Sequence, residues 1–229
     1  MRNVAAILFT GGLGFLLLVI ASQLGLGEPP MRVGQGILDV AATEVGAANI
    51  VTSVLLAYRG LDTLGELSIL FAAATAAGLV LGQRRASAAP DPEAGFILRA
   101  GADLLFPLLL VVGFYIILHG HLTPGGGFQG GVILAAAFFI GVLARPADSL
   151  DHTAIVVIEG LAGAAFIGIG LWALLADGAF LKPMLGQGTL GTLLSAGTLP
   201  MLSLAIGLKV GSELAGLMTS LSGTEAREP

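Results

Sequence analysis

The sequence HGHLTPGGGFQGG at residues 119–131 decides the fold, because it connects two apolar stretches that are each long enough to cross a bilayer. Six of its thirteen residues are glycine, which accepts positive φ and lets other backbone approach closely. The flanking segments are therefore predicted to form a tight antiparallel helical hairpin. Its turn places His119, His121 and Thr123 at a membrane edge, where ions or partner subunits pass.

The composition is that of a membrane protein. The 229 residues are 55% hydrophobic and only 11% charged, with a mean hydropathy of +0.95, so a water-soluble surface is excluded. The 35 glycines suit close helix packing in lipid. The absence of cysteine excludes disulfides, iron–sulfur ligation and thiolate zinc sites. The net charge of −5 is spread over loops and forms no basic stripe for nucleic acid.

An all-α integral membrane protein with about six transmembrane helices is predicted. Crossing a hydrocarbon core takes about 20 apolar residues. The qualifying or nearly qualifying stretches are residues 4–24, 61–82, 96–118, 127–143, 153–175 and 189–211. Residues 47–58 are too short and are predicted to form a half-helix or interfacial helix that leads into the second span. The first stretch is longer than a signal-peptide core and is predicted to be a retained membrane helix.

Basic residues orient this topology. With a cytoplasmic N-terminus, six spans place Arg2, Arg84, Arg85, Arg99, Arg145, Lys209 and Arg227 inside, Arg32 and Lys182 outside, and Arg59 near a boundary. That excess inside agrees with the positive-inside rule. The polar, proline-bearing residues 84–95 are predicted to be a cytoplasmic linker between a two-span segment, residues 1–83, and a four-span domain, residues 96–229.

Several charged residues are candidates for an ion pathway. Arg59, Asp62 and Glu66 are spaced by three and four residues, so on a helix they share one face. Either Glu66 relays protons or cations, or the group is an ion pair that fixes helix depth at the membrane boundary. Arg99 and Asp103 form a similar pair at the start of the third span, with an interfacial anchor as the alternative.

Glu159 lies about 9 Å into the fifth span at 1.5 Å per residue. No basic residue is within reach on its own helix, so it needs a partner from another helix or from another protein of an assembly, or it is protonated. It either takes up and releases protons or serves as a neutral hydrogen-bond donor. Lys209 and Glu213 are one turn apart near the predicted end of the last span. Either they belong to the ion pathway, or Lys209 extends to the cytoplasmic surface.

The hairpin itself offers no metal site. His119 and His121 point to different sides of a helix and no third ligand is apparent, so proton handling or hydrogen bonds to loop carbonyls are expected instead. Residues 125–130 match a dinucleotide-binding pattern by letter, but they follow a membrane helix rather than a strand. The pairs Gly126/Gly130 and Gly127/Gly131 are predicted to be helix-packing faces.

The stretch FYIILHGHLTPGGGFQGGV at residues 114–132 closely resembles the B-type subunits (the MnhB/MrpB family) of Mrp-type cation/proton antiporters. The resemblance continues through Glu159-Gly160 and residues 207–211. Residues 49–70, with YRGLDTLGE at 58–66, are similar to the C-terminal end of the large A-type subunits, so the chain resembles a fusion of the two modules. Where members of that family often carry an acidic residue before Arg59, this chain has Ala57 and Tyr58, and no relay through that position is implied.

The resemblance implies a member of an assembly in the cell membrane that exchanges Na⁺ for H⁺. The implied partners are the large A and D antiporter-like subunits and the small C, E, F and G subunits; the resemblance implies no cofactor and no enzymatic activity. Two alternatives stay open. The chain is either a purely structural scaffold or the equivalent subunit of a membrane-bound hydrogenase-type ion-pumping complex.

Overall fold

The computed structural model describes residues 2–23, 32–85, 94–145 and 151–222, and within these ranges it contains helices, turns and irregular segments but no strand. The chain divides into two compact units, Met1–Ile37 and Leu38–Pro229. Helix α1 (Arg2–Gln23) belongs to the first unit, and α2 (Arg32–Val45) crosses the boundary. Most of the predicted linker, residues 84–95, lies outside the described residues, and the proposed division at that linker stays a prediction.

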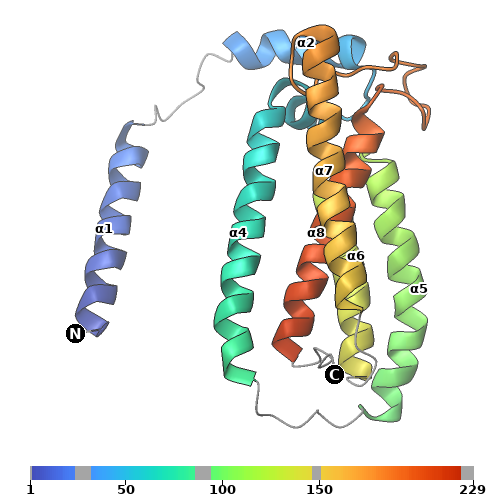
Figure 1. The fold of residues 1–229 in the computed structure, drawn as a ribbon. Helices are drawn as coiled ribbons and strands as arrows, with labels where there is room; N and C mark the ends of the chain where they lie inside the picture. The colour runs from blue at the N-terminus through green and yellow to red at the C-terminus, as the bar shows by residue number, and fades with distance from the viewer. Residues whose placement is uncertain (1, 24–31, 86–93, 146–150, 223–229) are drawn as a thin grey trace. The chain divides into compact units, whose positions relative to one another are not determined.

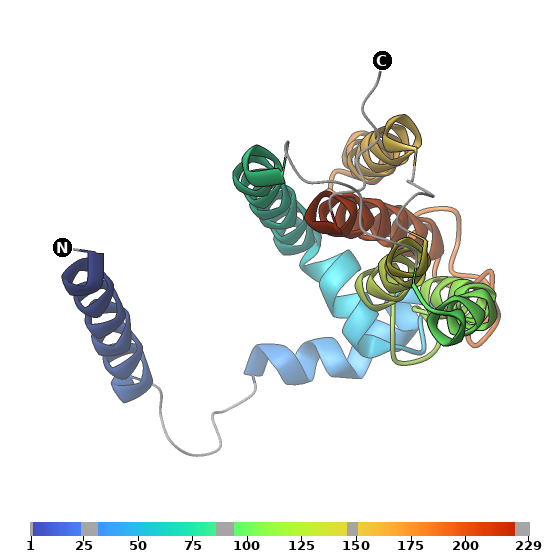
Figure 2. The same cartoon turned by 90° about the horizontal axis from the view of Figure 1, so that it is seen from below.

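The second unit is a bundle built around one central helix (Figure 1). After α2 its elements are α3 (Ile50–Ser53), the π-helix η1 (Val54–Tyr58), α4 (Gly60–Arg85), α5 (Phe96–Leu118), α6 (Gly127–Ala144), α7 (His152–Asp177) and α8 (Leu199–Ser222). Helix α8 packs against α4, α6 and α7, and α5 packs on the outer side of α6. Figure 2, seen from below, shows α8 enclosed by these neighbours.

The prediction of a multi-span, all-α membrane protein is confirmed. Among the described residues, five helices are long and apolar enough to cross a membrane: Gly60–Val80, Phe96–Leu118, Gly127–Ala144, His152–Asp177 and Leu199–Met218. A sixth candidate is the pair Gly34–Val45 and Ile50–Tyr58, which bends by 92° and forms either a broken span or a re-entrant loop. The first predicted span is helical, but its described apolar part, Ile7–Gln23, is shorter than the other spans.

The bend between α2 and α3 has a local cause. Gly46 has a φ of +75°, which a residue with a side chain rarely adopts, so the helix ends there. Asn49 then starts α3, because its side chain accepts hydrogen bonds from the backbone N–H groups of Val51 and Thr52. Helix α2 itself was not predicted from the sequence. The short apolar segment 47–58 does form short helices, as expected.

The predicted boundaries of the last span are wrong. Residues 189–211 were expected to be helical, but α8 begins at Leu199 and continues to Ser222. Residues 178–198 are irregular, because glycines with positive φ at 186, 188, 191 and 197 interrupt any helix there. Lys209 is consequently the eleventh of the 24 residues of α8, not a residue near its end. It cannot extend to the membrane surface, as the second alternative required.

Glycines allow α6 to pack closely against its neighbours. A Cβ at Gly127 would lie 2.5 Å from the Ser203 carbonyl oxygen on α8, and one at Gly131 would lie 2.8 Å from the Gly207 oxygen. A Cβ at Gly130 would lie 2.7 Å from the Gly113 oxygen on α5. Residues with side chains would therefore push these helices apart.

Gly126 has a different role from the packing role predicted for it. A Cβ there would meet only the Gln129 side chain, at 3.6 Å, which is ordinary contact. Its φ of +134° is what requires glycine, because it precedes the first residue of α6 and turns the chain into the helix.

Candidate functional site

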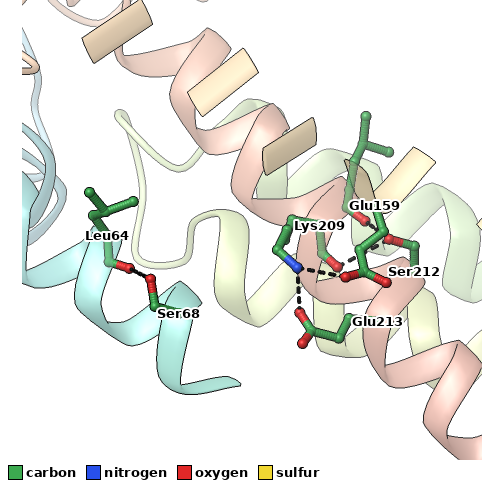
Figure 3. A network of polar contacts seen from close by, with 7 residues as sticks. Leu64, Ser68, Glu159, Lys209, Ser212 and Glu213 are labelled. Carbon is green, nitrogen blue, oxygen red and sulfur yellow. Dashed lines mark hydrogen bonds and ion pairs between the residues drawn. The ribbon is translucent and has the colours of Figure 1, made fainter. Parts of the chain in front are cut away.

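Three charged side chains meet halfway along the central helix. The Lys209 ammonium on α8 donates to Glu159 Oε1 on α7 at 2.8 Å and to Glu213 Oε2, one turn further along α8, at 2.9 Å (Figure 3). The sequence predicted that Glu159 needs a partner from outside its own helix. The structure supplies that partner from within the same chain, 50 positions away.

This charged cluster, Glu159–Lys209–Glu213, is largely withdrawn from the surface of the chain. The exposed fraction of the side chain is 11% for Lys209, 19% for Glu159 and 3% for Glu213. The Lys209 stem lies against Gly163 of α7, where a Cβ would be 3.3 Å from Lys209 Cδ. The Lys209 Nζ also lies 4.9 Å from the centre of the Phe71 ring on α4, a cation–π distance.

Two cavities border the cluster between α4 and α7. The larger, of about 320 Å³, is lined by Leu64, Leu67, Ser68, Phe71, Glu159, Gly160, Gly163, Ala164, Ile167 and Lys209. The smaller, of about 140 Å³, is lined by Phe71, Ala74, Thr75, Gly78, His152, Ile155, Val156, Glu159, Glu213, Gly216 and Leu217. Phe71 and Glu159 line both cavities, so the cluster lies where the two meet. Figure 3 shows Leu64 and Ser68 on α4 across from the cluster.

His152 is a lining residue that the sequence reasoning missed. It is seven positions before Glu159, which is two helical turns, so both side chains share one face of α7. That spacing was the available signal.

The first predicted constellation is only partly assembled. Arg59 ion-pairs with Asp62, but it lies in the break between η1 and α4 rather than on the α4 helix. Glu66 is exposed, and within the described chain its carboxylate has no ion-pair partner. A shared helix face for all three residues is therefore not observed, because α4 begins only at Gly60.

Asp103 connects two helices. Its carboxylate accepts a 2.8 Å hydrogen bond from Arg145, the residue that follows α6. Arg99, the partner predicted on the same helix, also interacts with it electrostatically. The side chain of Asp103 is 61% exposed, so this ion pair lies at the surface of the chain.

The two hairpin histidines differ in environment. His119 stacks on Tyr115, with ring centres 4.1 Å apart, and its Nδ1 lies 3.0 Å from the Tyr115 carbonyl oxygen. His121 is fully buried, with Nε2 3.4 Å from the Thr192 carbonyl oxygen, and burial lowers the pKa of its imidazole. The described residues contain no group of His, Cys, Asp and Glu able to hold a metal ion.

Asn49 and Thr52, in the segment before α4, form hydrogen bonds with the glycine-rich turn of the hairpin, and these bonds together form a clasp. The Asn49 side-chain amide donates to the carbonyl oxygens of Gly120 and Thr123, both at 2.8 Å, and the Thr52 hydroxyl donates to Gly120 at 2.6 Å. The Asn49 backbone N–H also donates to the His121 carbonyl oxygen at 3.0 Å. Sequence reasoning missed this contact, which ties the A-like segment to the glycine-rich turn.

An all-α bundle of membrane-length helices with a charged cluster at the middle of its central helix defines a multi-span membrane protein that holds charged groups inside its helical bundle. Residues 97–216 match the family described as a domain related to the MnhB subunit of Na⁺/H⁺ antiporters. The match covers more than half of the chain, so the protein belongs to this family.

Relatives extend the likeness beyond that domain. An uncharacterized protein of Methanocaldococcus jannaschii is 30% identical in an alignment over 217 residues that covers 83% of this chain and 82% of that protein. A probable A/B subunit of a K⁺/H⁺ antiporter from Rhizobium meliloti is 26% identical over 75% of this chain, but the match spans only 20% of that much longer protein. The joining of A-like and B-like parts in one chain therefore has a counterpart.

Two solved complexes contain chains of the same fold. A chain of the membrane-bound sulfane sulfur reductase, an archaeal respiratory membrane complex, is 39% identical with a TM-score of 0.78; the match covers 96% of this chain and 97% of that one. A chain of the Mrp complex from Dietzia sp. DQ12-45-1b is 30% identical with a TM-score of 0.76, covering 99% of this chain and 26% of that one. Both neighbours are parts of multi-subunit membrane complexes.

Proposed function

We propose that this chain is a membrane subunit of a complex that exchanges Na⁺, or another monovalent cation, for protons across the cell membrane. Its N-terminus is cytoplasmic, and its neighbours are large A and D antiporter-like subunits and small C, E, F and G subunits. Residues 1–83 form the A-like part of the chain, and residues 96–229 form the B-like part. The family match supports this proposal.

The charged cluster is the observation that carries a transport role rather than a purely structural one. Charges inside a bilayer are expensive and are retained mainly where ions or protons pass. Glu159 and Lys209 line a cavity of about 320 Å³, so water or an ion has space beside the pair. The cluster is therefore proposed to line part of the ion route, at an interface that other subunits complete.

Transport by the reconstituted complex tests this role. The complex is purified through a tag on this chain, and Na⁺-driven proton movement is followed with a pH-sensitive dye in liposomes. Replacing Glu159→Gln is expected to lower the exchange rate by about a hundredfold, because it removes one of the charges on which proton transfer at the cluster depends. The matched control is Asp177→Asn, which neutralises a carboxylate that is 42% exposed.

The two variants also separate transport from scaffolding. If Glu159→Gln lowers only the yield of the assembled complex, and the exchange rate per complex is unchanged, the chain is a scaffold and the ion-route proposal is wrong.

A second candidate function is the equivalent subunit of a redox-driven, ion-pumping respiratory complex. It is favoured by the 39% identity to the sulfane sulfur reductase chain, which the match covers almost completely. This chain has no cysteine, so iron–sulfur ligands would come from other subunits. Mass spectrometry of the proteins that purify with the chain decides between the two, because iron–sulfur proteins accompany only the redox complex.

A further inference from the structure

The charged cluster contains one more acid than base. When all three groups are ionised, Glu159 and Glu213 contribute two negative charges and Lys209 one positive charge, so the cluster carries a net charge of −1. Both carboxylates form an ion pair with the same ammonium group. Its single positive charge can neutralise only one of them. An uncompensated charge at the middle of a membrane-spanning helix is costly, so a further positive charge is required.

The second side-chain oxygen of Glu213 is the position where the additional positive charge is needed. Glu213 Oε2 accepts the hydrogen bond from Lys209, while Oε1 is buried and has no hydrogen-bond partner among the described residues. Burying an ionised carboxylate oxygen without a partner is more costly than burying a protonated one. Glu159 is the more exposed of the two acids and is better able to remain ionised.

We propose that the cluster Glu159–Lys209–Glu213 is a binding site for a single exchangeable proton, held on Glu213. This inference deepens the proposed function and rests on it. In the loaded state an O–H bond forms at Glu213, the cluster is neutral, and Lys209 remains paired with Glu159. When the proton leaves, its bonding electrons stay on the carboxylate, and two ionised acids compete for one ammonium.

The surroundings of the site allow a proton to enter and leave. On α7, the titratable groups that line the two cavities are Glu159 and His152; on α8 they are Lys209 and Glu213. The α4 residues that line these cavities are uncharged, among them Ser68, Phe71 and Thr75. The smaller cavity reaches Glu213 and His152, and the larger reaches Lys209, so the site borders one cavity on each side.

Infrared difference spectroscopy counts this proton directly. The assembled complex is measured at neutral pH in Na⁺-free choline buffer, and each variant spectrum is subtracted from the native one. The native cluster is expected to hold one carboxylic acid. Glu213→Gln and Glu159→Gln each leave one acid facing one ammonium, so both are expected to hold none. Lys209→Gln leaves two acids without a cation and is expected to hold two.

The expected numbers of protonated carboxyl groups are one in the native cluster, none in either glutamate variant and two in Lys209→Gln. A single isolated carboxyl group cannot give this pattern. If the native spectrum shows no carboxylic acid that Glu213→Gln removes, the one-proton site is overturned, even where Glu159→Gln abolishes transport. If the pattern is found but transport does not depend on Glu159, the site stands and the ion-route proposal fails. Asp177→Asn controls for exposed carboxylates and leaves the count at one. The two glutamine variants keep the test decisive should Lys209→Gln fail to assemble.

Discussion

The two sides of α8 contrast sharply. On the side that faces α5 and α6, Gly127 and Gly131 leave no room for a side chain between α6 and α8, and Gly130 leaves none between α6 and α5. Toward α4 and α7, α8 carries the charged cluster beside cavities of about 320 and 140 Å³. At these glycines the helices leave no room for a side chain, whereas the other side carries charge next to open space.

The contrast divides structural from functional positions. Close packing of small residues holds helices together in lipid, where no hydrophobic driving force acts between them. An open, charged side needs such a rigid support, because an ion site tolerates little displacement. Substitutions on the packed side are therefore expected to abolish assembly, and substitutions on the charged side to alter transport in an assembled complex.

The largest effect is expected from Gly130→Leu on the packed side. The new side chain would meet the Gly113 carbonyl oxygen and the Ile117 side chain, so α5 and α6 must separate. The cost exceeds the roughly 1–3 kcal/mol typical of overpacked cores, because backbone has to move. Little or no assembled complex should be recovered after purification. Gly168→Leu is the control, since a Cβ at that position meets nothing within 4 Å. Normal recovery of Gly130→Leu would show that the contact between α5 and α6 is not tightly packed.

A smaller effect is expected from the same change on the charged side. Gly163→Leu extends a side chain into the larger cavity beside Lys209, where a Cβ meets only the flexible lysine stem. The complex should assemble, but its exchange rate should fall about tenfold, which corresponds to about 1.4 kcal/mol in the barrier. The ratio of transport to recovered protein is the measurement. An unchanged rate would mean that ions do not pass through this cavity.

This comparison also separates what the sequence could predict from what it could not. The all-α class and the five long spans from α4 to α8 followed from apolar length, because bilayer thickness fixes how many residues a span needs. The start of α8 was misplaced by ten residues, because hydropathy does not distinguish an apolar helix from an apolar, glycine-rich loop. Residues 189–198 are such a loop, and only their backbone conformation reveals it.

The charged cluster was half predictable. The cost of burial required a partner for Glu159, and that requirement could be read from its apolar neighbours. The identity of the partner could not be, since Lys209 is 50 positions away and helix order along the chain does not specify which helices touch. The hydrogen bonds of Asn49 to the hairpin could not be predicted either, because they join residues 71 and 74 positions apart in the sequence.

The clasp gives a third, weaker test at the end of the bundle. Asn49→Ala removes two hydrogen bonds to the hairpin and the cap of α3. The loss of such a cap typically costs about 0.5–2 kcal/mol, so the midpoint of thermal unfolding should fall by a few degrees. Thr43→Ala, at an exposed position on α2, is the control. If the two variants unfold at the same temperature, the clasp does not stabilise the hairpin.

The smallest effect is expected from His121 and appears only with pH. Burial lowers its pKa in the folded protein, so the unfolded chain binds a proton more readily than the folded one. The stability that His121 contributes is therefore complete above its ordinary pKa of about 6.5 and is lost as pH falls below that value. His121→Gln keeps a polar side chain but cannot titrate. The native complex should lose more thermal stability between neutral and mildly acidic pH than the variant does, with His119 common to both. Equal losses would show that His121 does not contribute to the pH dependence of stability as a buried, neutral imidazole.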